Sequence, residues 1–381
     1  MSLDGTPWET ALAWAPLVGH LYHFVLVVNA TSALGYSETT LGRLRFLVLV
    51  VFTLAAAWLG WLTCREPWWT WAWPTRSYMI LCMISGFVIG PLGSLRLALK
   101  KQPEGVAGTC SFHRAIDRAP RECYVGQGSG AWMLRLPGNQ SLELRVHEWE
   151  VGFADLPEAL DGLRILQLSD LHFSECYARA YFDWVIDHCR DRPADLVVVT
   201  GDVVEELATL AWIEPVLGRL EARLGKLAIL GNHDHEYGAG EVGATLESAG
   251  YELLEGRWRA FDVDGSAFAI GGTSAPWGPR FAAGDRPEAD FRLLLSHTPD
   301  LFPRAPSWGV DLMLSGHNHG GQIRFPLVGP IFMPSRYSRR FDRGFFRAGR
   351  TLMYASLGLG GKHPVRYGCI PEIAWFTLRR R

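Results

Sequence analysis

The sequence predicts a layered α/β sandwich that follows a group of membrane-spanning helices. Two observations lead to this fold class. Three long stretches near the N-terminus carry no charged side chain, and the later part of the chain alternates apolar, strand-like runs with segments of helical period. A chain of 381 residues with 48% hydrophobic content is long enough for such a two-part organisation.

The uncharged stretches cover residues 10–37, 46–64 and 77–95. Each reaches the roughly 20 residues needed to cross a bilayer core of about 30 Å. Buried helices of a soluble domain are the alternative, but such helices seldom lack charge for so long. We therefore expect a transmembrane region over residues 1–101, with spans at about 12–35, 45–64 and 77–99.

Basic residues beside these spans predict their orientation. Arg43 and Arg45 lie in the first loop and Arg96 follows the third span, whereas Arg65 and Arg76 lie on the opposite side. The positive-inside rule then places the C-terminal part of the chain in the cytoplasm.

The first span contains three polar residues, His20, His23 and Asn29. Contacts to a pore or substrate would explain them, and so would hydrogen bonds within a helix bundle. We favour the hydrogen bonds.

Overall composition excludes some classes of protein. A net charge of -2 gives no sign of a strongly basic nucleic-acid-binding protein. The seven cysteines include no C-x-x-C pair and are odd in number, so they predict neither a disulfide framework nor a zinc site. Cysteine usage therefore agrees with a reducing compartment.

Regular structure is expected mainly in the C-terminal part. Residues 102–140 are rich in glycine, proline and charge, which predicts a connector with a hairpin. Residues 141–381 are predicted to form the folded domain. Strand-like runs appear at "LRILQLSD", "LVVVTGD", "KLAILGNHD", "AFAIGG", "RLLLSHTPD" and "VDLMLSGHNH", with helical segments at 178–191, 207–224 and 240–249. This alternation predicts sheet strands buried on both faces.

Five of these runs stop on a residue that can bind a metal ion. The residues are Asp170, Asp202, Asn232, His297 and His317. In open α/β sheets the carboxyl ends of the strands line the ligand crevice, so we expect these side chains to converge.

Two further histidines extend this set. Residues i and i+2 of an extended segment point to the same side, so Asp170 with His172, and His317 with His319, would each face one site. Carboxylate, imidazole and amide donors suit manganese, iron or zinc. Seven donors are too many for one tetrahedral ion, but they suit two ions about 3.5–4 Å apart that share a carboxylate, the arrangement used for attack on phosphorus.

The series of motifs resembles a known superfamily. "SDLH", "TGDVV", "LGNHD", "LSHTP" and "SGHNHGG" follow the pattern of the calcineurin-like metallophosphoesterases. The flanks "GHNHGGQIRFP" and "SLGLGGKHPVRYGCIPEI" resemble its bacterial membrane-associated YkuE/YaeI-like phosphodiesterase branch. The resemblance covers residues 141–381. It implies two mixed sheets flanked by helices and says little about residues 1–100. Taken with the three predicted spans, the bacterial branch leads us to expect a multi-pass protein of the bacterial inner membrane.

The resemblance also implies a role for each motif residue. Asp170, His172 and His319 would bind the first metal ion, Asn232, His297 and His317 the second, and Asp202 would bridge both. His233 would contact the scissile phosphate and protonate the leaving oxygen or stabilise its charge. Asp234 would either orient His233 or only begin the following helix.

An arginine-rich segment, "SRYSRRFDRG", follows the last metal motif. Arg336, Arg339 and Arg340 are candidate substrate contacts, because guanidinium groups pair well with the phosphate oxygens of an anionic lipid or a pyrophosphate. A solvated basic loop, or one that touches anionic headgroups, is the alternative.

Together these features predict a membrane-anchored phosphoesterase that hydrolyses a phosphodiester or pyrophosphate by metal-activated hydroxide. A lipid-linked substrate such as UDP-2,3-diacylglucosamine is a candidate, because some members of the superfamily hydrolyse it in lipid A synthesis and anchoring would raise the enzyme concentration near a lipid. A noncatalytic membrane scaffold and a metal-dependent nuclease are the alternatives, and the near-neutral charge disfavours nucleic acid as a partner.

Overall fold

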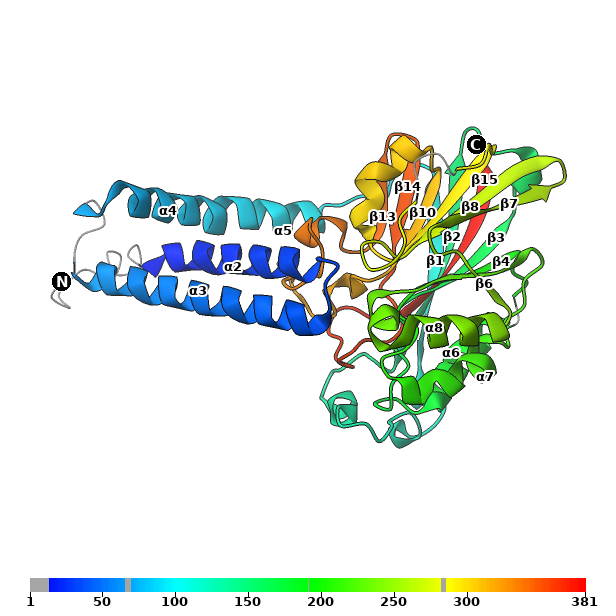
Figure 1. Cartoon of the computed structure of the whole chain (residues 1–381), viewed down its shortest axis with the longest axis horizontal. Coiled ribbons are helices and arrows are strands. Elements are labelled where there is room, and N and C mark those ends of the chain that lie inside the picture. Colours follow the sequence, from blue (N-terminus) through cyan, green and yellow to red (C-terminus); the bar gives the residue numbers. More distant parts are fainter. Residues whose placement is uncertain (1–13, 66–69, 191, 282–285) are drawn as a thin grey trace. The chain divides into compact units, whose positions relative to one another are not determined.

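The computed structural model describes residues 14–65, 70–190, 192–281 and 286–381, and the chain divides into two compact units (Figure 1). Unit 1 comprises residues 1–101 and 325–340. Unit 2 comprises residues 102–324 and 341–381.

Unit 1 consists mainly of helices that run alongside one another (Figure 1). They are α2 (Pro16–Ser32), α3 (Glu38–Arg65) and a continuous third helix made of α4 (Trp73–Ile84), the π-helical η2 (Ser85–Ile89) and α5 (Gly90–Ala98). Helix α2 packs against both α3 and α4. A Cβ atom on Gly19 would lie 1.7 Å from the carbonyl oxygen of Cys82, so only glycine allows this close approach of α2 to α4.

Two of these helices, Glu38–Arg65 and Trp73–Ala98, are long and apolar enough to cross a membrane. Within the most apolar 18 residues of each helix, only 11% and 17% of the segment is buried, whereas the core helix of a soluble protein is mostly buried. Helix α2 has 17 residues, about 26 Å at 1.5 Å per residue. The start of the first predicted span lies outside the described residues, so a three-span segment stays a prediction.

The polar side chains of α2 make hydrogen bonds within unit 1. His20 Nδ1 lies 2.7 Å from the Tyr78 hydroxyl, and its Nε2 lies 2.8 Å from the Phe52 carbonyl oxygen. His23 Nε2 lies 2.8 Å from Ser85 Oγ. The histidines therefore join neighbouring helices, as the hydrogen-bond interpretation predicts.

Unit 2 contains two large mixed sheets. The seven-stranded sheet has the order β1-β2-β15-β3-β4-β5-β6, and the six-stranded sheet has the order β13-β14-β10-β9-β8-β7. The strands are β1 (Val106–Arg114), β2 (Glu143–Phe153), β3 (Arg164–Leu168), β4 (Leu196–Thr200), β5 (Gly225–Ile229), β6 (Tyr251–Leu253), β7 (Arg257–Val263), β8 (Ser266–Thr273), β9 (Phe291–Ser296), β10 (Leu312–Ser315), β13 (Gly344–Ala348), β14 (Thr351–Ala355) and β15 (Glu372–Arg380). Two short strands, β11 (Arg324–Phe325) and β12 (Gly329–Pro330), pair separately.

Side chains fill the space between the sheets and cover their outer faces. The central layer includes Ile165 and Val198 from the first sheet and Leu293 and Leu314 from the second. Helices α6 (Arg179–Arg190), α7 (Ile213–Leu217) and α8 (Asn232–Ser248) cover the outer face of the seven-stranded sheet (Figure 1). The 3₁₀ segment η8 (Pro299–Trp308) contributes Phe302 to a core on the other sheet. The predicted strands buried on both faces are thus present.

Two predicted elements differ from the structure. Residues 102–140 contain β1, which pairs with β2 and forms an edge of the seven-stranded sheet. The helix predicted over 207–224 is short and broken, with η7 (Leu207–Trp212) followed by α7. Pro215 removes a backbone donor there and Gly218 follows α7, and both disfavour a longer helix.

Candidate metal centre

The predicted metal-binding side chains converge because they follow parallel strands. Strands β3, β4 and β5 pair in parallel, and so do β8, β9, β10 and β14. Hydrogen bonds also join the loops that follow the strands of the two sheets. The N–H of His317, after β10, donates to Asp170 Oδ1, after β3, at 2.8 Å, and His297 Nδ1, after β9, lies 2.9 Å from the Thr200 carbonyl oxygen at the end of β4. The loops from both sheets therefore meet at one place.

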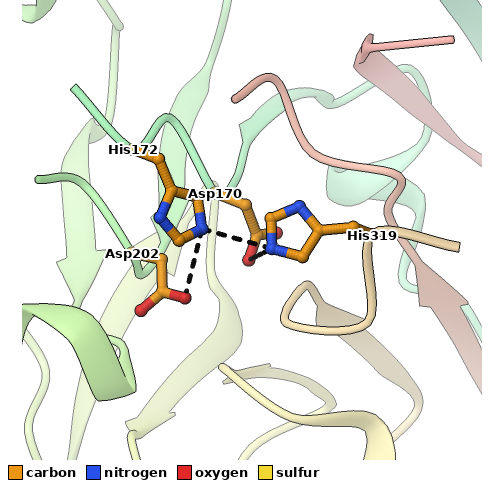
Figure 2. A group of neighbouring side chains, drawn as sticks. All are labelled: Asp170, His172, Asp202 and His319. Atoms are coloured by element: carbon orange, nitrogen blue, oxygen red, sulfur yellow. Dashed lines mark hydrogen bonds and ion pairs between the residues drawn. The ribbon is translucent and has the colours of Figure 1, made fainter. Parts of the chain in front are cut away.

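Four side chains form the first group of donors, and Figure 2 shows them facing one another. His172 Nε2 lies 3.2 Å from His319 Nε2 and 3.4 Å from Asp202 Oδ2. His319 Nε2 lies 3.5 Å from Asp170 Oδ1. These four residues hold one set of converging nitrogen and oxygen atoms.

A second group shares Asp202 with the first. His297 Nε2 lies 3.2 Å from His317 Nδ1, 3.0 Å from Asn232 Oδ1 and 3.4 Å from Asp202 Oδ2. The structure therefore brings together all seven side chains that the sequence predicts as ligands, in two groups.

Asp202 occupies the position between the two groups. Its Oδ2 atom is 3.4 Å from the His172 nitrogen and 3.4 Å from the His297 nitrogen. Its Oδ1 atom accepts a hydrogen bond from the backbone N–H of His233 at 2.9 Å. One carboxylate oxygen is thus fixed by the backbone while the other faces both groups.

This donor set fits two divalent cations. In each group two imidazole nitrogen atoms lie 3.2 Å apart and close to a carboxylate oxygen. A cation bound between these atoms would stabilise this arrangement. Burial, His172 and Arg366 hold the pKa of His319 well below its ordinary value of 6.5, so this imidazole is neutral, as a metal ligand must be. Oxygen and nitrogen donors without thiolate suit manganese, iron or zinc.

Backbone strain is concentrated in these loops. Asp170, His172, Asp202, His317 and His319 have φ values of 50°, 44°, 53°, 67° and 46°, and they are five of the nine non-glycine residues with positive φ in the described part of the chain. Such conformations are uncommon for residues other than glycine, although Asp and His adopt them more readily than most, and they gather at functional sites. The paired residues therefore converge through left-handed turns, and the expectation of an extended i, i+2 segment was wrong.

Two glycines make the close approach of these loops possible. A Cβ atom on Gly316 would lie 2.3 Å from Asp170 Oδ2, and one on Gly231 would lie 2.1 Å from Asp202 Oδ1. Any side chain at either position would displace a carboxylate of the centre.

Comparison with known proteins identifies the family of this chain. The model for the calcineurin-like phosphoesterases matches residues 163–321, which include all seven candidate ligands. The chain is 34% identical over 237 residues to the uncharacterized metallophosphoesterase YkuE of Bacillus subtilis strain 168, an alignment that covers 59% of this chain and 82% of that protein. The chain belongs to the calcineurin-like metallophosphoesterase family.

Two other relatives are informative. Phosphodiesterase YaeI of Escherichia coli K12 is 32% identical over 223 residues, covering 56% of this chain and 82% of that protein. A Danio rerio protein named transmembrane protein with metallophosphoesterase domain is 28% identical over 259 residues, covering 62% of this chain and 57% of that protein. Family and relatives make this chain a metal-dependent phosphoester hydrolase.

Glu205 is a residue of this metallophosphoesterase site that the sequence prediction missed. Its Oε2 atom lies 2.7 Å from His172 Nδ1 and 3.0 Å from His233 Nδ1. Its Oε1 atom accepts a hydrogen bond from the Tyr237 hydroxyl at 3.1 Å. Glu205 therefore holds both imidazoles from the side opposite their Nε2 atoms. Its position three residues after Asp202 was the available signal in the sequence.

The surroundings of His233 favour its protonated form. Burial lowers its pKa, but the negative charge of Asp202 and the contact with Glu205 outweigh burial and raise the pKa of His233 to about 9. A protonated imidazole can donate a proton to a leaving group.

Asp234 begins helix α8 and braces the neighbouring loop. Its Oδ2 accepts a hydrogen bond from the Gly231 N–H at 2.9 Å, as in a capping box. Its Oδ1 accepts from the N–H groups of Val203 and Val204 at 2.9 and 3.1 Å. Both side-chain oxygens thus bind backbone, which favours the helix-start interpretation over direct orientation of His233.

Arg366, in the "HPVR" segment, is a second residue that the prediction missed. Its side chain is 0% exposed, and its guanidinium donates to the carbonyl oxygens of Leu357 at 2.8 Å and Gly360 at 2.5 Å. Its Nη2 atom lies 3.3 Å from His319 Nδ1. Arg366 therefore ties the C-terminal loop to the metal centre.

The three predicted substrate-binding arginines all lie in unit 1. Arg339 donates hydrogen bonds to Ser94 Oγ at 3.1 Å, to the Val328 carbonyl oxygen at 2.8 Å and to Gly90 at 3.3 Å. Arg336 and Arg340 are exposed. Their contact with substrate stays a prediction.

Proposed function

We propose that this chain is a membrane-anchored phosphodiesterase that uses two divalent metal ions. Asp170, His172 and His319 would bind one ion, and Asn232, His297 and His317 the other. Asp202 would lie between the two ions and bind both. The position of Asp202 Oδ2, 3.4 Å from a nitrogen atom of each group, carries this proposal. Manganese, iron and zinc are the ions that the donors favour.

Bound metal ions at this centre supply Lewis acidity that activates water and offsets charge on the phosphate. The protein's own groups then act around that chemistry. His233, ion-paired through Nδ1 with Glu205, offers its Nε2–H to the leaving oxygen. The strained loops keep the ligands in place before substrate arrives, so little reorganisation is needed.

Membrane anchoring is supported by the apolar helices of unit 1 and by the name of the zebrafish relative. A lipid-linked phosphoester is our preferred substrate class, because an anchored enzyme meets its lipid substrate at high effective concentration. UDP-2,3-diacylglucosamine remains the specific candidate, and the bacterial inner membrane, with unit 2 in the cytoplasm, the proposed location.

Metal analysis combined with a chromogenic substrate tests the metal mechanism. Purified full-length protein supplied with manganese should hold about two equivalents of metal and hydrolyse bis(p-nitrophenyl) phosphate. Chelation should abolish hydrolysis, and manganese should restore it. A protein that folds normally, holds no metal and has no activity would instead be the noncatalytic scaffold.

The substrate class needs a separate test. We expect release of UMP from UDP-2,3-diacylglucosamine in mixed micelles. Hydrolysis of single-stranded DNA or RNA at a higher rate than of any lipid-linked ester would favour the nuclease alternative. Activity on bis(p-nitrophenyl) phosphate but not on the lipid would leave the metal mechanism intact and overturn the proposed lipid.

A further inference from the structure

Residues 325–340, here named the 325–340 loop, pack with the helices of unit 1 although they follow the metal motif in sequence. Hydrogen bonds within the unit fix this position. Asn29 of α2 is 1% exposed, and its Nδ2 atom donates to the Ile331 carbonyl oxygen and to Ser338 Oγ, both at 3.0 Å. Its Oδ1 atom accepts from the N–H of Met333 at 2.9 Å. A polar side chain of an otherwise apolar helix thus forms hydrogen bonds with backbone groups of the loop.

A second attachment holds the loop to helix α5. Arg339 donates to Ser94 Oγ and to the Gly90 carbonyl oxygen, at 3.1 and 3.3 Å. Asn29 lies near the end of α2 and Ser94 near the end of α5, so the loop sits across one end of the helices. Arg96 near the end of α5 is at this same end, and so is Arg45 near the start of α3, which is ion-paired with Glu38 at 3.0 Å.

The loop's outer surface is unusually apolar for a segment between strands. Leu327 is 90% exposed, Phe332 is 56% exposed and Phe325 is 50% exposed. Arg336 and Arg340 are exposed on the same loop. Three large apolar side chains exposed on one short loop, together with two exposed arginines, indicate an interaction surface.

A lipid bilayer fits this surface better than a protein partner does. The loop contacts α5 through β12, and the helices expose further apolar side chains, Leu92 on α5 and Phe46 and Leu54 on α3. Basic side chains at this end of the helices complement anionic headgroups. Apolar side chains with adjacent arginines are the composition of segments that lie in the headgroup layer.

We propose that the 325–340 loop inserts into the cytoplasmic headgroup layer, with Leu327 and Phe332 among the acyl chains and Arg336 and Arg340 at lipid phosphates. This inference rests on the proposed membrane anchoring. The loop begins six residues after His319 along the chain, so the metal motif and the proposed lipid-binding segment are neighbours in sequence. A phosphoester carried by an amphiphile is the substrate class that such a surface serves.

Fluorescence quenching in nanodiscs tests insertion directly. Full-length Leu327→Cys and Phe332→Cys variants carry the fluorophore NBD in nanodiscs of phosphatidylcholine and phosphatidylglycerol. Asp264→Cys, in the exposed β7–β8 turn, is the matched control. The exposed native cysteines, Cys64, Cys110 and Cys123, are first replaced by serine.

We expect the labels at 327 and 332, but not at 264, to shift to shorter wavelength and to be quenched by doxyl-phosphatidylcholine. Labels at 327 and 332 that stay as water-exposed and unquenched as the control would overturn the proposal. That result is also the one expected of a surface that binds a protein partner.

Hydrolysis separates this inference from the proposed function. Leu327→Glu should leave hydrolysis of soluble bis(p-nitrophenyl) phosphate unchanged and slow hydrolysis of nanodisc-embedded hexadecyl p-nitrophenyl phosphate severalfold. Leu207→Glu, which changes an exposed leucine of unit 2, should affect neither. A wild-type protein inactive on both esters would contradict the proposed function, while the quenching experiment would still decide whether the loop inserts.

Discussion

Replacing Glu205 by glutamine tests whether this carboxylate positions the imidazoles of the metal centre. The structure reveals this residue, whereas the sequence prediction missed it. Burial raises the pKa of Glu205, but its contacts with His172 and His233 outweigh burial and lower the pKa to about 2, so the side chain is a carboxylate at neutral pH. It lies 2.7 Å from His172 Nδ1 and 3.0 Å from His233 Nδ1. Glutamine keeps the shape but removes the charge at both contacts.

The expected loss follows from these two contacts. Hydrogen bonds to charged groups contribute about 1.5–3 kcal/mol and neutral ones about 0.5–1.5 kcal/mol, so each contact loses about 1–1.5 kcal/mol. Two contacts give about 2–3 kcal/mol, and at about 1.4 kcal/mol per tenfold in rate this is roughly a 30- to 150-fold fall in kcat/KM. Changes to residues that orient metal ligands typically cost about 10–100-fold.

The assay is hydrolysis of bis(p-nitrophenyl) phosphate under manganese saturation, with metal content measured in parallel. Glu241→Gln, which neutralises an exposed carboxylate of α8, is the control and should match the wild type. A Glu205→Gln protein with kcat/KM within twofold of the wild type would show that Glu205 does not position the imidazoles.

Three other perturbations have definite expected outcomes. Asp202→Asn should lower kcat by about 10²–10³-fold, the usual range for loss of a preorganised electrostatic contact, and metal analysis should show less than two equivalents bound. Asn29→Leu removes three hydrogen bonds to the 325–340 loop, each of which contributes about 0.5–1.5 kcal/mol of stability. We therefore expect faster amide hydrogen exchange in that loop than in the wild type, and unchanged exchange would contradict the attachment. Burial raises the pKa of Glu372, but contacts with His147, the Leu357 N–H and the Tyr354 hydroxyl outweigh it and lower the pKa below its ordinary 4.5. The stability that this carboxylate contributes is therefore present above about pH 4.5 and lost as pH falls further, so melting temperatures of Glu372→Gln and wild type should differ most near pH 7 and converge in acid.

The positions of the metal ligands could be predicted because they depend on local sequence. Polar residues directly after apolar runs, such as Asp202 and His297, mark the carboxyl ends of strands, and parallel strands bring those ends together. The conformation of the loops could not be predicted in the same way. The left-handed turns at His172 and His319 depend on close contacts with loops from distant strands.

The features that the sequence did not predict all depend on long-range contacts. Glu205 and Arg366 lie outside the recognised ligand motifs, and only the folded loops bring them to His172 and His319. The attachment of the 325–340 loop to Asn29 joins residues about three hundred positions apart, far beyond the reach of any periodic pattern. The first predicted span begins outside the described residues.

The place of β15 in the seven-stranded sheet has a consequence for biosynthesis. This strand, Glu372–Arg380, pairs in parallel with β2 and antiparallel with β3, so those two strands have no direct pairing with each other. During translation both are made long before β15, and each then presents an unpaired edge that invites aggregation. We expect the nascent chain to depend on chaperones until β15 has left the ribosome. Deletion of β15 should leave the apolar helices synthesised but the hydrolase unfolded.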